Sequence, residues 1–156
     1  MPTFSLPRTT VAARLVLTAG APASGSVFVM DRTAHHEGPE TVLDMLNRGD
    51  AFFPFRPESR ADAVLLIAKA HTVLLAVEGA PFPDPARLSA AQAADVELVL
   101  EGVATLTGRV QFELPDAHRR LLDFLNASQD SFFAVTQGST TNYVNRAHVL
   151  YARPTT

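Results

Sequence analysis

The sequence predicts a mostly β fold of the α+β class, made of two tandem units that each resemble a small β-barrel. We expect about five strands in each unit, one short helix after the second strand, and a pseudo-twofold relation between the units. Three observations predict this architecture. A motif occurs twice, apolar and polar residues alternate over short stretches, and each half contains a short amphipathic segment.

The motif that occurs twice reads LDMLNRGDAFFPF at residues 43–55 and LDFLNASQDSFFAV at residues 122–135. The flanking segments align in the same order, residues 14–29 with 97–112 and residues 68–77 with 145–154. Self-similarity of this kind indicates repeated structural units, so it takes priority over local patterns.

The alignment divides the chain into a first unit at residues 9–79, a Pro/Ala-rich linker at 80–92 and a second unit at 93–156. Three prolines in residues 81–85 make the start of the linker stiff and non-helical. A unit of about 65 residues has a marginal core by itself. We therefore expect the two units to share an apolar face.

The first two strands of each unit are predicted by alternation and by glycine. Val96, Leu98 and Leu100 alternate with other residues, as expected for a strand with one buried face. The second strand begins at Gly25 in the first unit and at Gly108 in the second.

The short helix follows in each unit and is expected to close one end of the barrel. In the first unit residues 38–40 start it and Asn47 or Gly49 ends it. In the second unit residues 115–116 start it, its leucines form one apolar face, and Asn126 is expected to end it in the left-handed conformation.

The third, fourth and fifth strands complete each unit. The third strand begins at the Phe pair, with one ring in the core and the other facing outward or toward the sister unit. A tight turn at His71 or His148 separates the fourth strand from the fifth.

Taken in this order, the LDxLN segments, the Phe pairs and the final strands resemble an uncharacterised bacterial family of small barrels. The segment YVNRAHVLYA at residues 143–152 is similar to the last strand–turn–strand of Sm-like and SH3-like barrels. The resemblance covers nearly the whole chain as two copies and implies a small-barrel fold. The sequence departs from Sm proteins, whose helix precedes the first strand and whose turn has a Gly where Arg146-Ala147-His148 stands here. Ring assembly and RNA binding are therefore not carried over.

Composition narrows the function classes. The chain has 156 residues, a formal net charge of −3 and no cysteine, which excludes disulfides and thiolate metal sites. Residues 1–8 lack the pattern of a secretory signal, and no apolar run approaches the ~18 residues of a membrane span. We expect a cytoplasmic protein. Neither unit is net basic, which disfavours nucleic-acid binding.

Two histidines, His71 and His148, recur at aligned positions. They could form a paired, pH-sensitive binding site, since histidine titrates near neutrality. They could instead be turn residues whose rings bond backbone groups at the rim of the barrel. We favour this second interpretation.

Aromatic and basic residues supply further candidates for an interface: Phe53, Phe133 and Arg146. Burial in the core explains one Phe of each pair more simply than base stacking does, and leaves the outer member for an interface. Asp44 and Asp123 also recur at aligned positions. We interpret them as residues on the exposed surface of each helix, and an acid–base pair is the less favoured alternative. The sequence HHE at residues 35–37 does not supply the three or four fixed ligands that a zinc site needs. It indicates a polar loop.

The sequence contains no recognisable catalytic set, phosphate loop or dinucleotide motif. We therefore expect no catalytic, cofactor-binding or metal site, although an enzyme is not excluded. The leading hypothesis is a non-catalytic protein-interaction or regulatory module with an unknown protein partner, in which strand edges could also pair two copies as a homodimer. The alternatives are an Sm-like RNA-binding protein and a small-molecule binder or enzyme with its site between the units.

Overall fold

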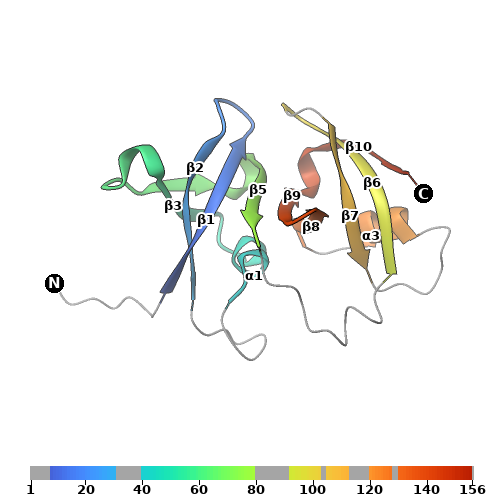
Figure 1. The fold of residues 1–156 in the computed structure, drawn as a ribbon, viewed down its shortest axis with the longest axis horizontal. Helices are drawn as coiled ribbons and strands as arrows, with labels where there is room; N and C mark the ends of the chain where they lie inside the picture. The colour runs from blue at the N-terminus through green and yellow to red at the C-terminus, as the bar shows by residue number, and fades with distance from the viewer. Residues whose placement is uncertain are drawn as a thin grey trace.

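A computed structural model describes residues 8–30, 40–79, 92–102, 105–112, 120–127 and 130–155 (Figure 1). The described chain is mostly β, with ten strands and two short α-helices. The strands are β1 (Arg8–Leu17), β2 (Ala23–Met30), β3 (Phe52–Pro57), β4 (Leu65–Ala68), β5 (Thr72–Glu78), β6 (Gln92–Leu100), β7 (Thr105–Phe112), β8 (Phe132–Gln137), β9 (Thr140–Asn145) and β10 (Val149–Pro154). The helices are α1 (Val42–Asn47) and α3 (Arg120–Ala127), and single 3-10 turns lie at Glu58–Arg60, Lys69–His71 and Arg146–His148.

All ten strands belong to one open antiparallel sheet in the order β10-β6-β7-β8-β9-β5-β1-β2-β3-β4. The predicted architecture of two barrel-like units, each with a helix after its second strand, was therefore wrong. A strand has two edges, and β5 uses one for β1 and the other for β9. No edge of β5 remains to pair with β4 and close a barrel.

The predicted pseudo-twofold relation was wrong for a related reason. The first half (residues 8–79) meets the second half (residues 92–155) through β5 and β9, which lie side by side in the middle of Figure 1. A twofold axis would bring the same strand of each half together. Here the fifth strand of one half pairs with the fourth strand of the other, so the junction is head-to-tail.

The two halves have the same strand order and the same register. Leu15 lies opposite Ala23 in the first half, as Leu98 lies opposite Leu106 in the second. The third and fourth strands match likewise, with Phe52 opposite Ala68 and Phe132 opposite Asn145. We call residues equivalent when they hold the same place in the two registers or in the two LDxLN segments.

Two hydrophobic cores lie on opposite faces of the sheet at the junction. Leu75 and Tyr143 point into the first core, whereas their neighbours Leu74 and Val144 point into the second. Successive residues of a strand face opposite sides of a sheet, so β5 and β9 form a wall that both cores share. Each half is thus partly covered by residues of the other.

Helix α1 begins at a reciprocal cap. The Thr41 hydroxyl accepts from the Asp44 N–H, and the Asp44 carboxylate accepts from the Thr41 N–H, both at 3.0 Å. The helix ends at Asn47, one of its two predicted ends. The left-handed end expected at Asn126 is not observed, because Asn126 lies within α3 and no described residue other than glycine has a positive φ. The Asn47 side chain also bonds a strand of the second half.

Two glycines allow neighbouring strands to approach closely. A Cβ added to Gly25 would lie 2.2 Å from the Arg56 carbonyl oxygen, and one added to Gly108 would lie 2.6 Å from that of Thr136. Both glycines were expected to begin the second strands, but they lie inside β2 and β7. Each faces a close approach of the next strand, β3 or β8.

Candidate functional site

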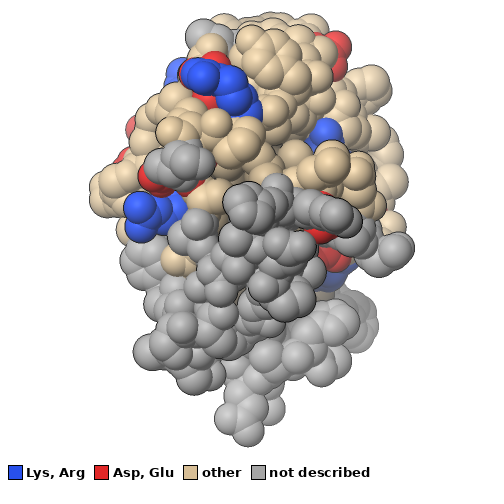
Figure 2. Space-filling model, turned by 90° about the vertical axis from the view of Figure 1, so that its right-hand side faces the viewer, with Lys and Arg blue, Asp and Glu red and all other residues tan. Residues whose placement is uncertain are grey.

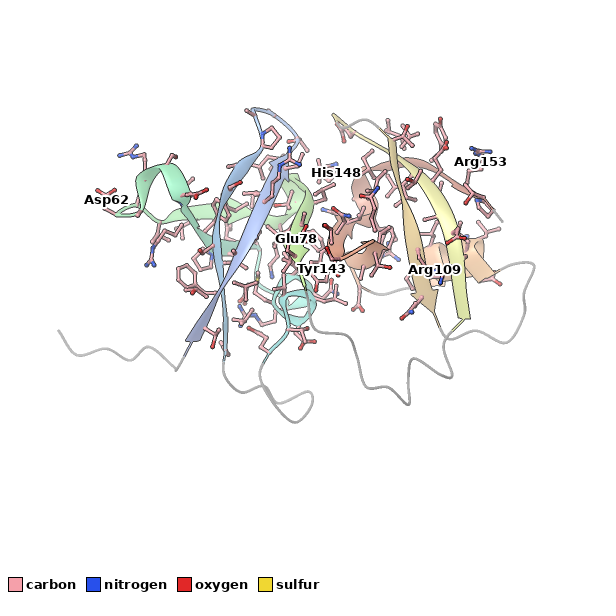
Figure 3. All side chains as sticks on the ribbon, viewed as in Figure 1. Asp62, Glu78, Arg109, Tyr143, His148 and Arg153 are labelled. Atoms are coloured by element: carbon pink, nitrogen blue, oxygen red, sulfur yellow. The ribbon has the colours of Figure 1, made fainter. Side chains whose placement is uncertain are left out.

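The two end strands of the sheet, β4 and β10, are the candidate site. Each has one neighbour in the described sheet, β3 for β4 and β6 for β10, so each presents a free edge. Figure 3 places Asp62, in the turn that precedes β4, and Arg153, on β10, at opposite ends of the molecule. Free edges carry unpaired N–H and C=O groups that can bind another strand.

Large apolar side chains gather at these two edges. Among the described residues, seven large hydrophobic side chains are exposed, and six of them lie on or beside β4 and β10: Phe52, Val64, Leu65, Leu66, Leu150 and Tyr151. Single exposed apolar residues are ordinary, whereas clusters indicate an interaction surface.

The junction between β5 and β9 shows how such edges pair within the chain. Five residue pairs align, from Leu74 opposite Val144 to Glu78 opposite Thr140. Side chains reinforce the ladder at the end where Glu78 lies opposite Thr140. Glu78 accepts from the Ser139 hydroxyl at 2.9 Å and from the Thr140 hydroxyl, and these bonds lower the pKa of the Glu78 carboxyl.

Helix α1 adds a second contact across the junction. Asn47 Oδ1 accepts from the Phe132 N–H at 2.9 Å, and Asn47 Nδ2 donates to the Phe132 carbonyl at 3.2 Å. The Phe132 ring is buried in the first core together with Tyr143, whose phenol pKa is raised by burial and, to a lesser extent, by Asp44. The halves are therefore joined by backbone, amide and ring contacts at once.

His148 takes part in the junction and His71 does not. His148 Nε2 bonds the Ala70 carbonyl at 2.6 Å, and Nδ1 bonds Glu101 at 2.8 Å. His71, which follows Ala70 in the turn Lys69–His71, is exposed. The two histidines hold equivalent places, but only one of them has a neighbouring half to contact.

The predicted aromatic candidates, Phe53 and Phe133, lie inside the two cores. The exposed member of the first pair is Phe52, whereas both members of the second pair are buried. The difference follows from position, because Phe132 is at the junction and Phe52 is beside the free β4 edge.

Arginines near β10 are engaged with other groups. Arg146 donates from Nη1 to the Leu125 carbonyl at 3.1 Å, and Arg153 pairs with Glu97 at 2.9 Å. Figure 2 shows the end of the molecule that carries β6 and β10, where blue and red atoms lie in small neighbouring groups among tan ones. This face has no broad positive patch among its described residues.

A buried charged group beneath α1 was not predicted from the sequence. Lys69 donates from Nζ to the Met45 carbonyl at 2.9 Å and to the Arg48 carbonyl at 3.1 Å, at the end of the helix. Burial lowers the pKa of Lys69, and the nearby Asp50 carboxylate opposes that effect. The buried Glu40 carboxylate pairs with Arg48 at 3.1 Å. The sequence offered one sign of this special position, because Lys69 is its only lysine.

A hollow of about 790 Å³ lies on one face of the sheet, mainly over the first half, and reaches residues 137–142 of the second half. Its lining includes Arg14, Arg56, Glu78 and Asn142. Asn142 is buried, and its Nδ2 atom has no hydrogen-bond partner within the described part of the chain. The hollow is open to solvent, and its lining mixes both charges.

The structure offers no metal centre in the ranges it describes, where no three His, Asp or Glu side chains come together. The HHE segment at residues 35–37 lies outside the described residues. No described helix has the length and hydrophobicity needed to cross a membrane.

Comparisons with models of protein families, with curated proteins and with solved structures found no significant match to this chain.

Proposed function

We propose that this protein is an interaction module that binds a protein partner through its free strand edges, β4 and β10. The carrying observation is the placement of six of the seven exposed large hydrophobic side chains on or beside these edges. An edge supplies main-chain hydrogen bonds for affinity, and the apolar side chains beside it supply specificity.

The charge distribution favours a protein partner over the Sm-like RNA-binding alternative. Nucleic-acid binding depends on cations that are available to phosphates. Around β10, Arg153 is paired with Glu97 and Arg146 bonds the end of α3, while the whole chain carries a net charge of −3. RNA binding therefore has less support than edge pairing.

Binding of a small polar ligand in the hollow on the face of the sheet is a second candidate. The unpartnered Nδ2 of buried Asn142, which lines the hollow, favours it. A thermal-shift screen of small anions and polar metabolites tests this candidate, with Asn142→Leu as the comparison. A ligand that stabilises the wild type and not the variant supports it, and no shift with any compound contradicts it.

Affinity capture from the source cells tests the edge-binding function. Tagged wild type is compared with Leu66→Glu on β4 and Tyr151→Glu on β10. Thr10→Glu is the matched control, because Thr10 is exposed on β1, whose two edges are both paired within the sheet. We expect the wild type and the control to retain a protein after nuclease treatment, and at least one edge variant to lose it. Capture that disappears with nuclease, or that is the same in all four proteins, would contradict the proposal.

A further inference from the structure

We propose that the partner of these edges is a second copy of this chain, with β10 of one copy paired antiparallel to β4 of the next. This inference rests on the proposed edge-binding function and specifies its partner. Its basis is the junction inside the chain, where the strand equivalent to β10 already pairs with the strand equivalent to β4.

The equivalence of the edges follows from the registers. In each half the fifth strand pairs with the first strand with the same shift, Leu17 opposite Thr72 and Leu100 opposite Val149. Thus β5 and β10 are equivalent, and β4 is equivalent to β9. In the internal junction, the outer edge of β5 in the first half pairs with the outer edge of β9 in the second half. This pairing leaves β4 and β10, the complementary pair, free at opposite ends.

Side-chain burial supports the inference most directly. At the β4 end, Phe52 is 57% and Leu66 is 72% exposed, whereas their equivalents at the junction, Phe132 and Tyr143, are 1% and 5% exposed. The apolar residues that the free edge exposes are thus the ones that the occupied edge buries.

The β10 end repeats this contrast. Leu150 is 64% and Tyr151 is 58% exposed, whereas their equivalents on β5, Val73 and Leu74, are 0% and 5% exposed. Burial of all four exposed side chains would require only that the internal junction be repeated between chains.

Two polar side chains that bond across the internal junction have equivalents that are exposed at the free edges. Asn47 holds the backbone of Phe132 across the junction, and the equivalent Asn126 is exposed on α3. His148 bonds the Ala70 carbonyl across the junction, and the equivalent His71 is exposed. In the proposed contact, Asn126 of one copy binds the Phe52 backbone of the next, and His71 of the next copy binds the Ala147 carbonyl of the first.

The internal register fixes the register between copies. Leu75 lies opposite Tyr143 in the junction, so Ala152 of one copy is expected opposite Leu66 of the next. The Thr155 N–H points to Asp95 on β6, so the preceding residue, Pro154, faces the free edge and has no N–H to offer there. The rung at Pro154, which is equivalent to Val77 opposite Thr141, therefore lacks a backbone donor that its counterpart inside the chain has.

A contact between two different edges continues from copy to copy. Such head-to-tail contacts close into rings or extend as filaments, whereas a contact between identical edges stops at a dimer. We therefore expect assemblies of several copies and not the isolated homodimer considered from the sequence.

Sedimentation of the purified full-length chain over a concentration series tests the proposal. Leu66→Glu blocks β4, Tyr151→Glu blocks β10, and Thr10→Glu on β1, a strand paired on both sides, is the control. We expect wild type and control to form assemblies larger than a dimer, and each edge variant alone to be monomeric. An equimolar mixture of the two edge variants is expected to form a dimer, because each supplies the edge that the other lacks. Circular dichroism and thermal melting of each variant show whether it is folded, and formation of the mixed dimer requires both to be.

Several outcomes would overturn this inference. A wild type that stays monomeric at every concentration contradicts it, as does a dimer that persists in one edge variant alone, which would show pairing between identical edges. These results leave the edge-binding function standing if capture from cells still loses a different protein in an edge variant. If capture is also unaffected by both edge variants, the function fails as well.

Discussion

The side-chain amide of Asn47 bonds both backbone groups of Phe132, at 2.9 Å from the N–H and 3.2 Å from the carbonyl. This contact joins the end of α1 in the first half to the start of β8 in the second. Asn47 therefore ends α1, as predicted, and also forms part of the junction, a role that the sequence did not predict.

Asn47→Ala is expected to lower the free energy of unfolding by about 1–3 kcal/mol, because Phe132 keeps a buried N–H and carbonyl without partners. Urea denaturation of dilute protein measures the loss. Asn126→Ala is the matched control, since Asn126 is exposed, and should change the stability of the monomer by less than about 0.5 kcal/mol. Equal losses in both variants would contradict the assigned role of Asn47.

His148→Ala is expected to lower the free energy of unfolding by about 0.5–1.5 kcal/mol, through loss of the bonds to Ala70 and Glu101. His71→Ala should stay within about 0.5 kcal/mol of wild type in the monomer, because His71 is exposed. Thermal melting of the two variants in one buffer makes the comparison. A larger loss for His71 would contradict the asymmetry between these equivalent residues.

Lys69→Met keeps the apolar stem of the side chain and removes its ammonium group. The Met45 and Arg48 carbonyls then lose their donor, and we expect a loss of about 1–3 kcal/mol in the free energy of unfolding. Chemical denaturation measures this loss, with Arg60→Met at an exposed turn as the control. A variant as stable as the control would show that the cost of burying the lysine offsets its hydrogen bonds.

Gly25→Ala places a Cβ 2.2 Å from the Arg56 carbonyl oxygen, so β2 and β3 must move apart. We expect a loss of about 1–3 kcal/mol in the free energy of unfolding, as for other overpacked sites. Gly49→Ala is the control, because nothing lies within 4 Å of its added Cβ. Thermal melts that coincide for the two variants would rule out the close approach at Gly25.

Glu78→Gln tests the pH dependence of the junction. Hydrogen bonds from Thr140 and Ser139 lower the pKa of Glu78 in the folded chain, so its ionised form stabilises the fold. This stabilisation is complete above the ordinary Glu pKa of ~4.3 and is lost as pH falls through the lower, folded pKa. We expect Glu78→Gln to melt below wild type at neutral pH and the difference to disappear in acid, with Glu58→Gln as the control. A difference that is constant with pH would contradict the assignment.

The sequence predicted local features of the fold well where a short pattern of residues has a single structural explanation. The alternation at Val96, Leu98 and Leu100 indicated a strand, and these residues are buried in the second core. The capping box at Thr41 and Asp44 was also present in the sequence, as a Thr followed three residues later by an acidic residue, but the helix start was placed earlier. Lys69 gave no local sign that it would lie under a helix.

The candidate site was predicted only in outline. Strand edges were named as a possible interface, but Phe53 and Phe133 proved to be core residues, while Phe52, Leu66 and Tyr151 are the exposed ones. Phe52 and Phe132 occupy nearly identical local sequences, so no local pattern could separate them. Their different burial depends on whether another half of the sheet lies beside them.

By itself the sequence determined which segments become strands and which faces of them are apolar, because alternation and turn chemistry act over a few residues. Only the tertiary structure decided that the second edge of β5 pairs with β9 and not with β4 of its own half, which turned two expected barrels into one open sheet. The physical reason is that every strand has two edges with the same unpaired backbone groups. The choice between closing a half and joining two halves depends on long-range packing that no short stretch of sequence specifies.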